Sequence, residues 1–208
     1  MDFLEVVSTQ RAIRRFVTEP VSDDVVRQVL DAAVRAPSGG NRQPWRFIVV
    51  RDSDLKRRLG RLYGECGDEL IRSAPFYTRA LQDPAADPAA ARMMKSSRYL
   101  VEHFEEVPVF IVACMLSDGQ PLSFTQAASI YPAVQNIALA ARNLGLGTTI
   151  TTIHRYRHNE IRDLLGVPRD AAEIAAMIPM GYPAGKFGAG PRKPATEVSF
   201  LNRWGTPL

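Results

Sequence analysis

The sequence predicts a single α+β domain with a central β-sheet flanked by helices. Several segments repeat apolar residues at helical spacing, and shorter apolar or β-branched runs, typical of strands, alternate with them along the chain. The connections between these segments are uneven in length. With 208 residues, 46% hydrophobic and 23% charged, the chain can bury one sizeable core. We therefore expect residues 1–208 to form one domain without an internal repeat.

In the first half, the pattern predicts helices at 4–9, 22–33 and 54–63 and a strand at 45–51. Ser22 can cap the second helix, and the negative charges of Asp23 and Asp24 would interact favourably with the positive end of the helix dipole. That helix is expected to end before Pro37, because proline cannot continue it.

Residues 64–106 read as less regular. The run Asp83–Pro88 contains two prolines and is predicted to break any helix. A long irregular segment between helices and strands with clear sequence patterns is often a lid over a binding site. We therefore expect a lid insertion at about residues 64–106.

In the second half, the pattern predicts strands at 107–116, 148–153 and 174–181 and helices at 124–144 and 160–165. The continuously apolar run 107–116 is typical of a central strand. The long helix at 124–144 carries apolar residues at helical spacing over about five turns. Phe200, Leu201 and Trp204 make the C-terminal tail too apolar to remain in solvent, so we expect it to wrap a second subunit.

Composition narrows the functional classes. The net charge is +4 with arginines spread along the chain, whereas nucleic-acid binders more often concentrate them, so a basic nucleic-acid module is a minor alternative. Two cysteines and three histidines show no metal-ligand spacing, and no metal site is expected. No apolar run could cross a bilayer, and the N-terminus does not resemble a secretory signal. We expect a cytoplasmic protein.

The polar turn at residues 36–44 is the most informative segment. Its glycines let backbone amides approach a ligand, and Ser38, Asn41 and Gln43 add donors and acceptors. The ordinary alternative is a helix end followed by a strand start. Two basic clusters, Arg11–Phe16 and Pro191–Pro194, favour ligand binding, because a phosphate is best held by guanidinium groups from several directions.

Motifs of several common enzyme classes are missing from the sequence. There is no Gly-x-Gly-x-x-Gly after the first strand, no P-loop and no Gly-x-Ser-x-Gly elbow. No pair of acids suggests a general acid and base. If the protein is an enzyme, its chemistry would therefore belong to a bound cofactor, with the chain supplying orientation and electrostatics.

Taken together, four blocks resemble the FMN-dependent nitroreductase superfamily over nearly the whole chain. They are Arg11–Phe16 (RAIRRF), Pro37–Trp45 (PSGGNRQPW), Gln135-Asn136 with Leu144–Gly147, and Gly181–Pro183 with Arg192–Pro194. Ile150-Thr151-Thr152, followed by Asp163–Gly166 and Gly181–Pro183, is most similar to the iodotyrosine-deiodinase-like branch of that superfamily.

The resemblance implies a mixed sheet and a homodimer with two FMN sites at the subunit interface. By this resemblance, the residues that would contact the phosphate and ribityl are Arg11, Ala12, Arg14 and Arg192. Those that would contact the partner's flavin are Pro37, Ser38 and Gly39, and those that would contact the flavin ring are Ile150, Thr151 and Thr152. Asn41 and Gln43 are further expected binding residues. In that branch a threonine hydroxyl donates to flavin N5, which favours one-electron chemistry. Thr152 would take this role, with Thr151 as the competitor.

The implied function is an oxidoreductase. NADH or NADPH would deliver hydride to flavin N5, and a nitroaromatic, quinone or activated alkene would then accept the electrons. Phe76, Arg98 and Tyr99 in the predicted lid are candidate substrate contacts.

Two alternatives share the flavin. A reductive dehalogenase would need a lid that binds a halotyrosine zwitterion, and residues 64–106 lack the Glu, Tyr and Lys pattern for this. A flavin-storage protein without efficient turnover is the other alternative. It is suggested by Ala12, which replaces the usual serine, and by Gly190, where many members carry lysine.

Overall fold

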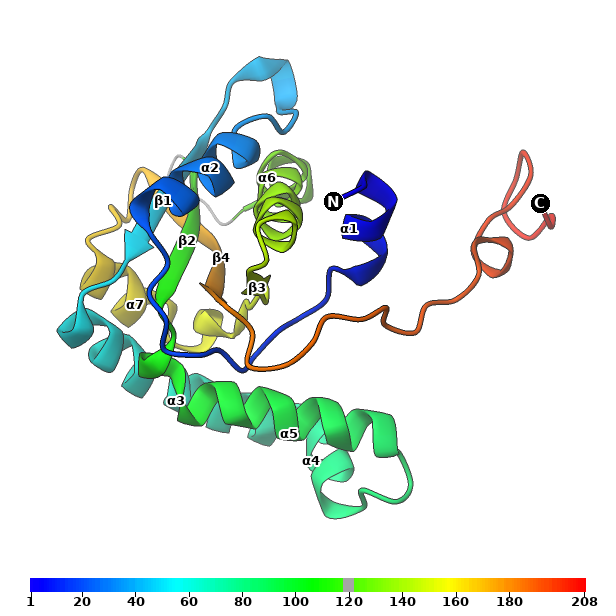
Figure 1. Cartoon of the computed structure of the whole chain (residues 1–208), viewed down its shortest axis with the longest axis horizontal. Coiled ribbons are helices and arrows are strands. Elements are labelled where there is room, and N and C mark those ends of the chain that lie inside the picture. Colours follow the sequence, from blue (N-terminus) through cyan, green and yellow to red (C-terminus); the bar gives the residue numbers. More distant parts are fainter. Residues whose placement is uncertain (118–121) are drawn as a thin grey trace.

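A four-stranded β-sheet lies at the centre of the computed structural model, which describes residues 1–117 and 122–208 (Figure 1). The strands follow the order β1 (Trp45–Val50), β2 (Val109–Leu116), β4 (Ala172–Gly181), β3 (Gly147–Thr148), and neighbours pair antiparallel. An isolated parallel bridge joins Ala12 to Thr148, so the sheet is mixed. The predicted α+β class is confirmed.

Helices lie on both faces of the sheet and beside it (Figure 1). They are α1 (Phe3–Thr9), α2 (Asp23–Ala33), α3 (Ser53–Ser73), α4 (Pro75–Gln82), α5 (Pro88–Glu102), α6 (Phe124–Asn143) and α7 (His158–Leu165). Successive side chains of a strand point to opposite faces. In β2, Val109, Ile111 and Ala113 belong to one core, whereas Phe110 and Val112 belong to the other. Among the described residues, no helix is long and apolar enough to span a membrane.

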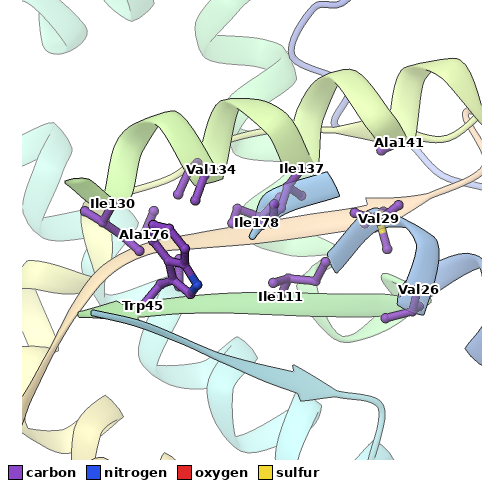
Figure 2. Close-up of a cluster of buried hydrophobic side chains, with 14 of the residues drawn as sticks. Val26, Val29, Trp45, Ile111, Ile130, Val134, Ile137, Ala141, Ala176 and Ile178 are labelled. Carbon is purple, nitrogen blue, oxygen red and sulfur yellow. The ribbon is translucent and has the colours of Figure 1, made fainter. Parts of the chain in front are cut away.

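The first core lies between the sheet and the helices α2 and α6 (Figure 2). Val29 of α2, Ile137 of α6 and Ile178 of β4 are fully buried there. The caps match the sequence pattern. The Ser22 hydroxyl accepts from the Val25 amide, and Ser123 and Gln126 form a capping box at the start of α6. The second core packs α3 and α7 against the opposite face.

The expectation of irregular structure over residues 64–106 is wrong. Helix α3 continues to Ser73, and α4 and α5 follow it as a helical layer beside the sheet (Figure 1). Pro75 and Pro88 begin these two helices, where the missing proline N–H is not needed. The Asp87 carboxylate accepts from the amides of residues 89 and 90 and caps α5. The helical structure is interrupted at Ala74, between α3 and α4, and over residues 83–87, between α4 and α5.

The predicted strand at 148–153 is also shorter than expected. Strand β3 ends at Thr148, Thr151 forms an isolated bridge with Met177, and a 3₁₀ turn covers Ile153–Arg157. At Gly147 a Cβ atom would lie 2.6 Å from the Ile13 side chain, so only glycine lets the N-terminal segment approach β3 this closely. The Ile13 amide then donates to the Thr148 carbonyl oxygen at 2.8 Å.

His154, in the 3₁₀ turn, makes the free energy of unfolding depend on pH. His154 is buried, and its Nε2 lies 3.0 Å from the Ile174 carbonyl oxygen. Burial lowers the pKa of His154 from 6.5 to about 4, against the effect of that hydrogen bond. The unfolded chain therefore binds the proton more readily. The contribution of the neutral His154 imidazole to the free energy of unfolding is complete above about pH 6.5 and is lost as the pH falls towards 4.

We expect the free energy of unfolding to fall by about 2 kcal/mol between pH 7 and about pH 5 through this residue. Urea unfolding of the parent and of His154→Gln at both pH values measures the effect. The variant keeps a donor for the carbonyl oxygen but does not titrate in this range. Equal pH dependence in the two proteins would contradict the assignment to His154.

Candidate functional site

A cavity of about 420 Å³ lies between the segment 149–153 and the helices α3 and α5. Residues 149–153 and Arg14 line one side, and residues of α3, α4 and α5 line the other. The volume is within the range of sites for small molecules and cofactors. The cavity therefore gathers the N-terminal basic block, the threonine-rich segment and the predicted lid.

Arg14 supplies positive charge to the cavity. The guanidinium has no hydrogen bond or ion pair within residues 1–117 and 122–208, although it is half-buried. Burial holds the pKa of Arg14 below its ordinary value, and the nearby charge of Arg11 lowers it further. A half-buried cation without a carboxylate partner among the described residues carries a desolvation cost that an anion would offset, so this position suits an anionic ligand.

The two adjacent threonines differ in their hydrogen bonding. The Thr151 hydroxyl lies 2.8 Å from the Tyr63 hydroxyl, and the Thr151 backbone pairs with Met177 in both directions. The Thr152 side chain lines the cavity, is exposed, and makes no hydrogen bond to any described residue. Thr151 is thus held in place, while the Thr152 hydroxyl is available to a ligand.

The helical side of the cavity is mostly apolar. Leu70 and Ile71 of α3 and Met93 and Met94 of α5 lie on it. Arg98 also lines the cavity, but its Nε donates to the Glu102 carboxylate at 2.7 Å.

The other two candidate substrate contacts lie elsewhere. Tyr99 borders a much smaller neighbouring pocket, where its ring stacks on His103. The Arg15 guanidinium lies over the Tyr99 ring, 3.6 Å from the ring centroid. Phe76 is largely exposed and does not line the cavity. The geometry thus brings only Arg98 of these three candidates to the main cavity.

The polar turn at 37–43 forms a separate structure on α6. The Ser38 hydroxyl accepts from the Gln43 amide at 3.0 Å, and the Gly39 amide donates to Ser129 of α6 at 3.2 Å. Asn41 and Gln43 adopt positive φ values of 53° and 50°, and their side chains are hydrogen-bonded to each other. The turn does not line the cavity of its own chain.

Arg11, Ala12 and Arg192 do not line the cavity either. Arg11 and Ala12 are exposed beside Arg14, and the Arg192 side chain donates to the carbonyl oxygen of Pro191. Conversely, sequence reasoning missed Tyr63. Nothing in the local pattern connects Tyr63 with Thr151, because the two are 88 positions apart. No group of His, Cys, Asp and Glu able to hold a metal occurs among the described residues.

Comparison with known proteins places these features in a family. The model of the nitroreductase family matches residues 7–182. NADH dehydrogenase of Thermus thermophilus is 31% identical over 192 residues, which cover 91% of this chain and 90% of that protein. Iodotyrosine deiodinase 1 of Rattus norvegicus is 30% identical over 189 residues, which cover 88% of this chain but only 62% of the rat protein.

The fold is similar to that of a solved iodotyrosine deiodinase bound to FMN and 3-iodo-L-tyrosine. The TM-score is 0.74 at 23% identity, with 99% of this chain and all of that chain covered. Fold and cavity thus define an α+β protein that can enclose a small molecule between a sheet edge and a helical layer. The chain belongs to the nitroreductase family and is an oxidoreductase of that family.

Proposed function

We propose that this protein binds FMN at the cavity and passes electrons from NADH or NADPH to a small organic acceptor. The observation that carries the proposal is the half-buried Arg14 guanidinium, which has no partner in the described chain and lies at a cavity that also exposes a free threonine hydroxyl. The FMN-bound family structure supports the choice of cofactor. Nitroaromatics, quinones and activated alkenes are the proposed acceptors.

The residues at the cavity fit the parts of FMN. An isoalloxazine ring is planar and largely apolar, and its phosphate is a dianion. Arg14 can offer charge-assisted hydrogen bonds to an anion, and the exposed Ile150 gives an apolar surface between Thr149 and the two following threonines. The apolar helical side can exclude water from above the ring and contact an uncharged acceptor.

When bound, FMN would supply the hydride and electron-transfer chemistry between the nicotinamide and the acceptor. The chain's contribution is to hold and orient both molecules. The Thr152 hydroxyl is the proposed donor to N5, because the Thr151 hydroxyl is already paired. Protons for the reduced acceptor can come from water, and no general acid from this chain is required.

We also propose that the site is completed in a homodimer. The turn at 37–43 lies outside the cavity of its own chain, so Pro37, Ser38 and Gly39 would reach the flavin of the partner subunit. The tail after Pro191 extends away from the body of the molecule (Figure 1). Its Trp204 side chain is 91% exposed, and Phe3 and Leu4 of α1 expose apolar surface as well. A second copy of the chain would cover these surfaces.

The decisive experiment is to purify the protein after incubation with FMN and to record its visible absorption and molecular mass. We expect a yellow dimer that is bleached by NADH or NADPH without air and is reoxidised by a nitroaromatic or quinone. A flavin-bound protein that neither nucleotide bleaches would favour storage. Halotyrosine turnover with dithionite, without nitroaromatic turnover, would favour the dehalogenase. A colourless monomer that ignores FMN would contradict the proposal.

Arg192 offers a test of the C-terminal part of the proposed site. Arg192→Ala should weaken FMN retention by roughly tenfold or more, because a phosphate would lose one charge-assisted partner. Arg203→Ala, also in the exposed tail, is the matched control and should bind FMN like the parent. Fluorescence titration with FMN measures both. Equal affinity of Arg192→Ala and the parent would remove Arg192 from the phosphate site.

A further inference from the structure

The phenol of Tyr63 joins helix α3 to the threonine-rich segment at the cavity. Tyr63 lines the cavity but is only 4% exposed, and its hydroxyl lies 2.8 Å from the Thr151 hydroxyl. This contact links a helix of the cavity wall to the segment that supplies the free Thr152 hydroxyl. It therefore connects the wall of the cavity to the threonine proposed to contact the flavin.

A stack of aromatic rings fixes the position of this phenol. The Tyr63 ring stacks on Phe104 with a centroid distance of 4.0 Å, and Phe104 stacks on Phe110 at 4.4 Å. Phe110 belongs to β2, the long strand between β1 and β4. The phenol is thus oriented by the sheet itself, and a phenylalanine at position 63 would keep the stacking while losing only the hydroxyl.

The Tyr63 phenol stays protonated in this contact. Burial raises the pKa of Tyr63 to about 12, and the nearby charge of Arg14 only partly offsets this effect. Either hydroxyl can donate in the hydrogen bond, and in both cases the Thr151 side chain is tied to α3.

Three hydrogen bonds thus hold Thr151: the one with the Tyr63 hydroxyl and the two backbone bonds with Met177, at 3.0 and 2.9 Å. The next residue, Thr152, is the first residue outside the 3₁₀ turn, and its side chain has no partner in the described chain. The backbone position from which the Thr152 side chain projects is consequently restrained by the fixed residue before it.

We propose that Tyr63 is a positioning residue, which fixes Thr151 and thereby places the Thr152 hydroxyl against the flavin. This inference rests on the proposed FMN function. It predicts that loss of the Tyr63 hydroxyl changes how the site distinguishes oxidised from reduced FMN, with little effect on the fold.

The test compares the Kd values of oxidised and reduced FMN for Tyr63→Phe and the parent. We expect the ratio of the two Kd values to change by roughly two- to tenfold, the equivalent of one neutral hydrogen bond. Thr151→Val should reproduce the change, and the double variant should add nothing further, since both changes break the same bond. In a Thr152→Ala background, Tyr63→Phe should leave the ratio unchanged.

A matched control is Tyr156→Phe. The Tyr156 hydroxyl pairs with the Ser73 hydroxyl at the same distance of 2.8 Å and joins α3 to the 3₁₀ turn, but neither residue lines the cavity. The Kd ratio should not change in this variant. An unchanged ratio in Tyr63→Phe, or an equal change with and without Thr152, would overturn the positioning role.

Hydrogen exchange of the protein without FMN provides an independent readout. The Thr151 and Met177 amides should exchange faster in Tyr63→Phe than in the parent, because the bridge they form loses its side-chain support. A parent that binds no FMN would overturn the proposed function and the flavin part of this inference. Unchanged exchange at these two amides would overturn the link between Tyr63 and Thr151.

Discussion

Replacing Arg14 by methionine is expected to weaken FMN binding by roughly ten- to a hundredfold, the loss of one or two charge-assisted hydrogen bonds. The same change should raise the thermal midpoint of the protein without FMN, or leave it unchanged. The half-buried guanidinium has no partner within the described chain, so an apolar side chain of similar length removes a desolvation cost. Opposite signs for binding and stability are typical of a functional residue.

Fluorescence titration with FMN and thermal unfolding of the same preparations measure the two effects. Arg14→Lys keeps the charge but loses the paired donors of a guanidinium, and should bind FMN with intermediate affinity. Arg58→Met, at an exposed position of α3, is the control and should change neither quantity appreciably. An Arg14→Met protein that binds FMN like the parent would show that the phosphate lies elsewhere.

The fold was largely predictable because the core elements have strong local patterns. The uninterrupted apolar run of β2 and the helical spacing of α6 each identified their element, even though α6 contains Pro132. The run Asp83–Pro88 misled the interpretation of residues 64–106, because its second proline begins helix α5. Proline breaks a helix interior but also begins helices, and only the flanking caps distinguish the two roles.

The site was predictable only in part. Arg14, Thr151 and Thr152 were identified from short motifs, and the structure brings all three to one cavity. Tyr63 and the methionines of α5 were missed, because their place at the cavity depends on the packing of α3 and α5 and on no local pattern. The β-branched run after Gly147 predicted a longer strand, but strand propensity depends on a partner, and β4 pairs with this segment only at separate points.

Stability should depend strongly on one buried ion pair between α7 and β4. Arg162 is 4% exposed, and its guanidinium donates to the Glu173 carboxylate at 2.7 Å and to the carbonyl oxygens of Pro168 and Ala172. The other Glu173 oxygen lies 2.7 Å from the Nε2 atom of His158. The guanidinium thus satisfies two backbone acceptors and one carboxylate at the same time.

We expect Arg162→Ala to lower the free energy of unfolding by about 3–5 kcal/mol, because it leaves the Glu173 carboxylate and two carbonyl oxygens without their donor. This corresponds to a fall in the thermal midpoint of about 6–20 °C. The double variant Arg162→Met, Glu173→Leu should recover much of the loss, since removing both groups avoids a buried carboxylate without its guanidinium partner.

Arg169 provides the matched control for this ion pair. Its guanidinium pairs with Asp163 of α7 through two hydrogen bonds, but both side chains are more than half exposed. Solvent screens such a pair, so Arg169→Ala should leave the thermal midpoint nearly unchanged. If Arg162→Ala unfolds at the same temperature as Arg169→Ala, burial does not govern the contribution of these arginines. In that case, the Glu173 carboxylate does not lie in a buried environment beside Arg162.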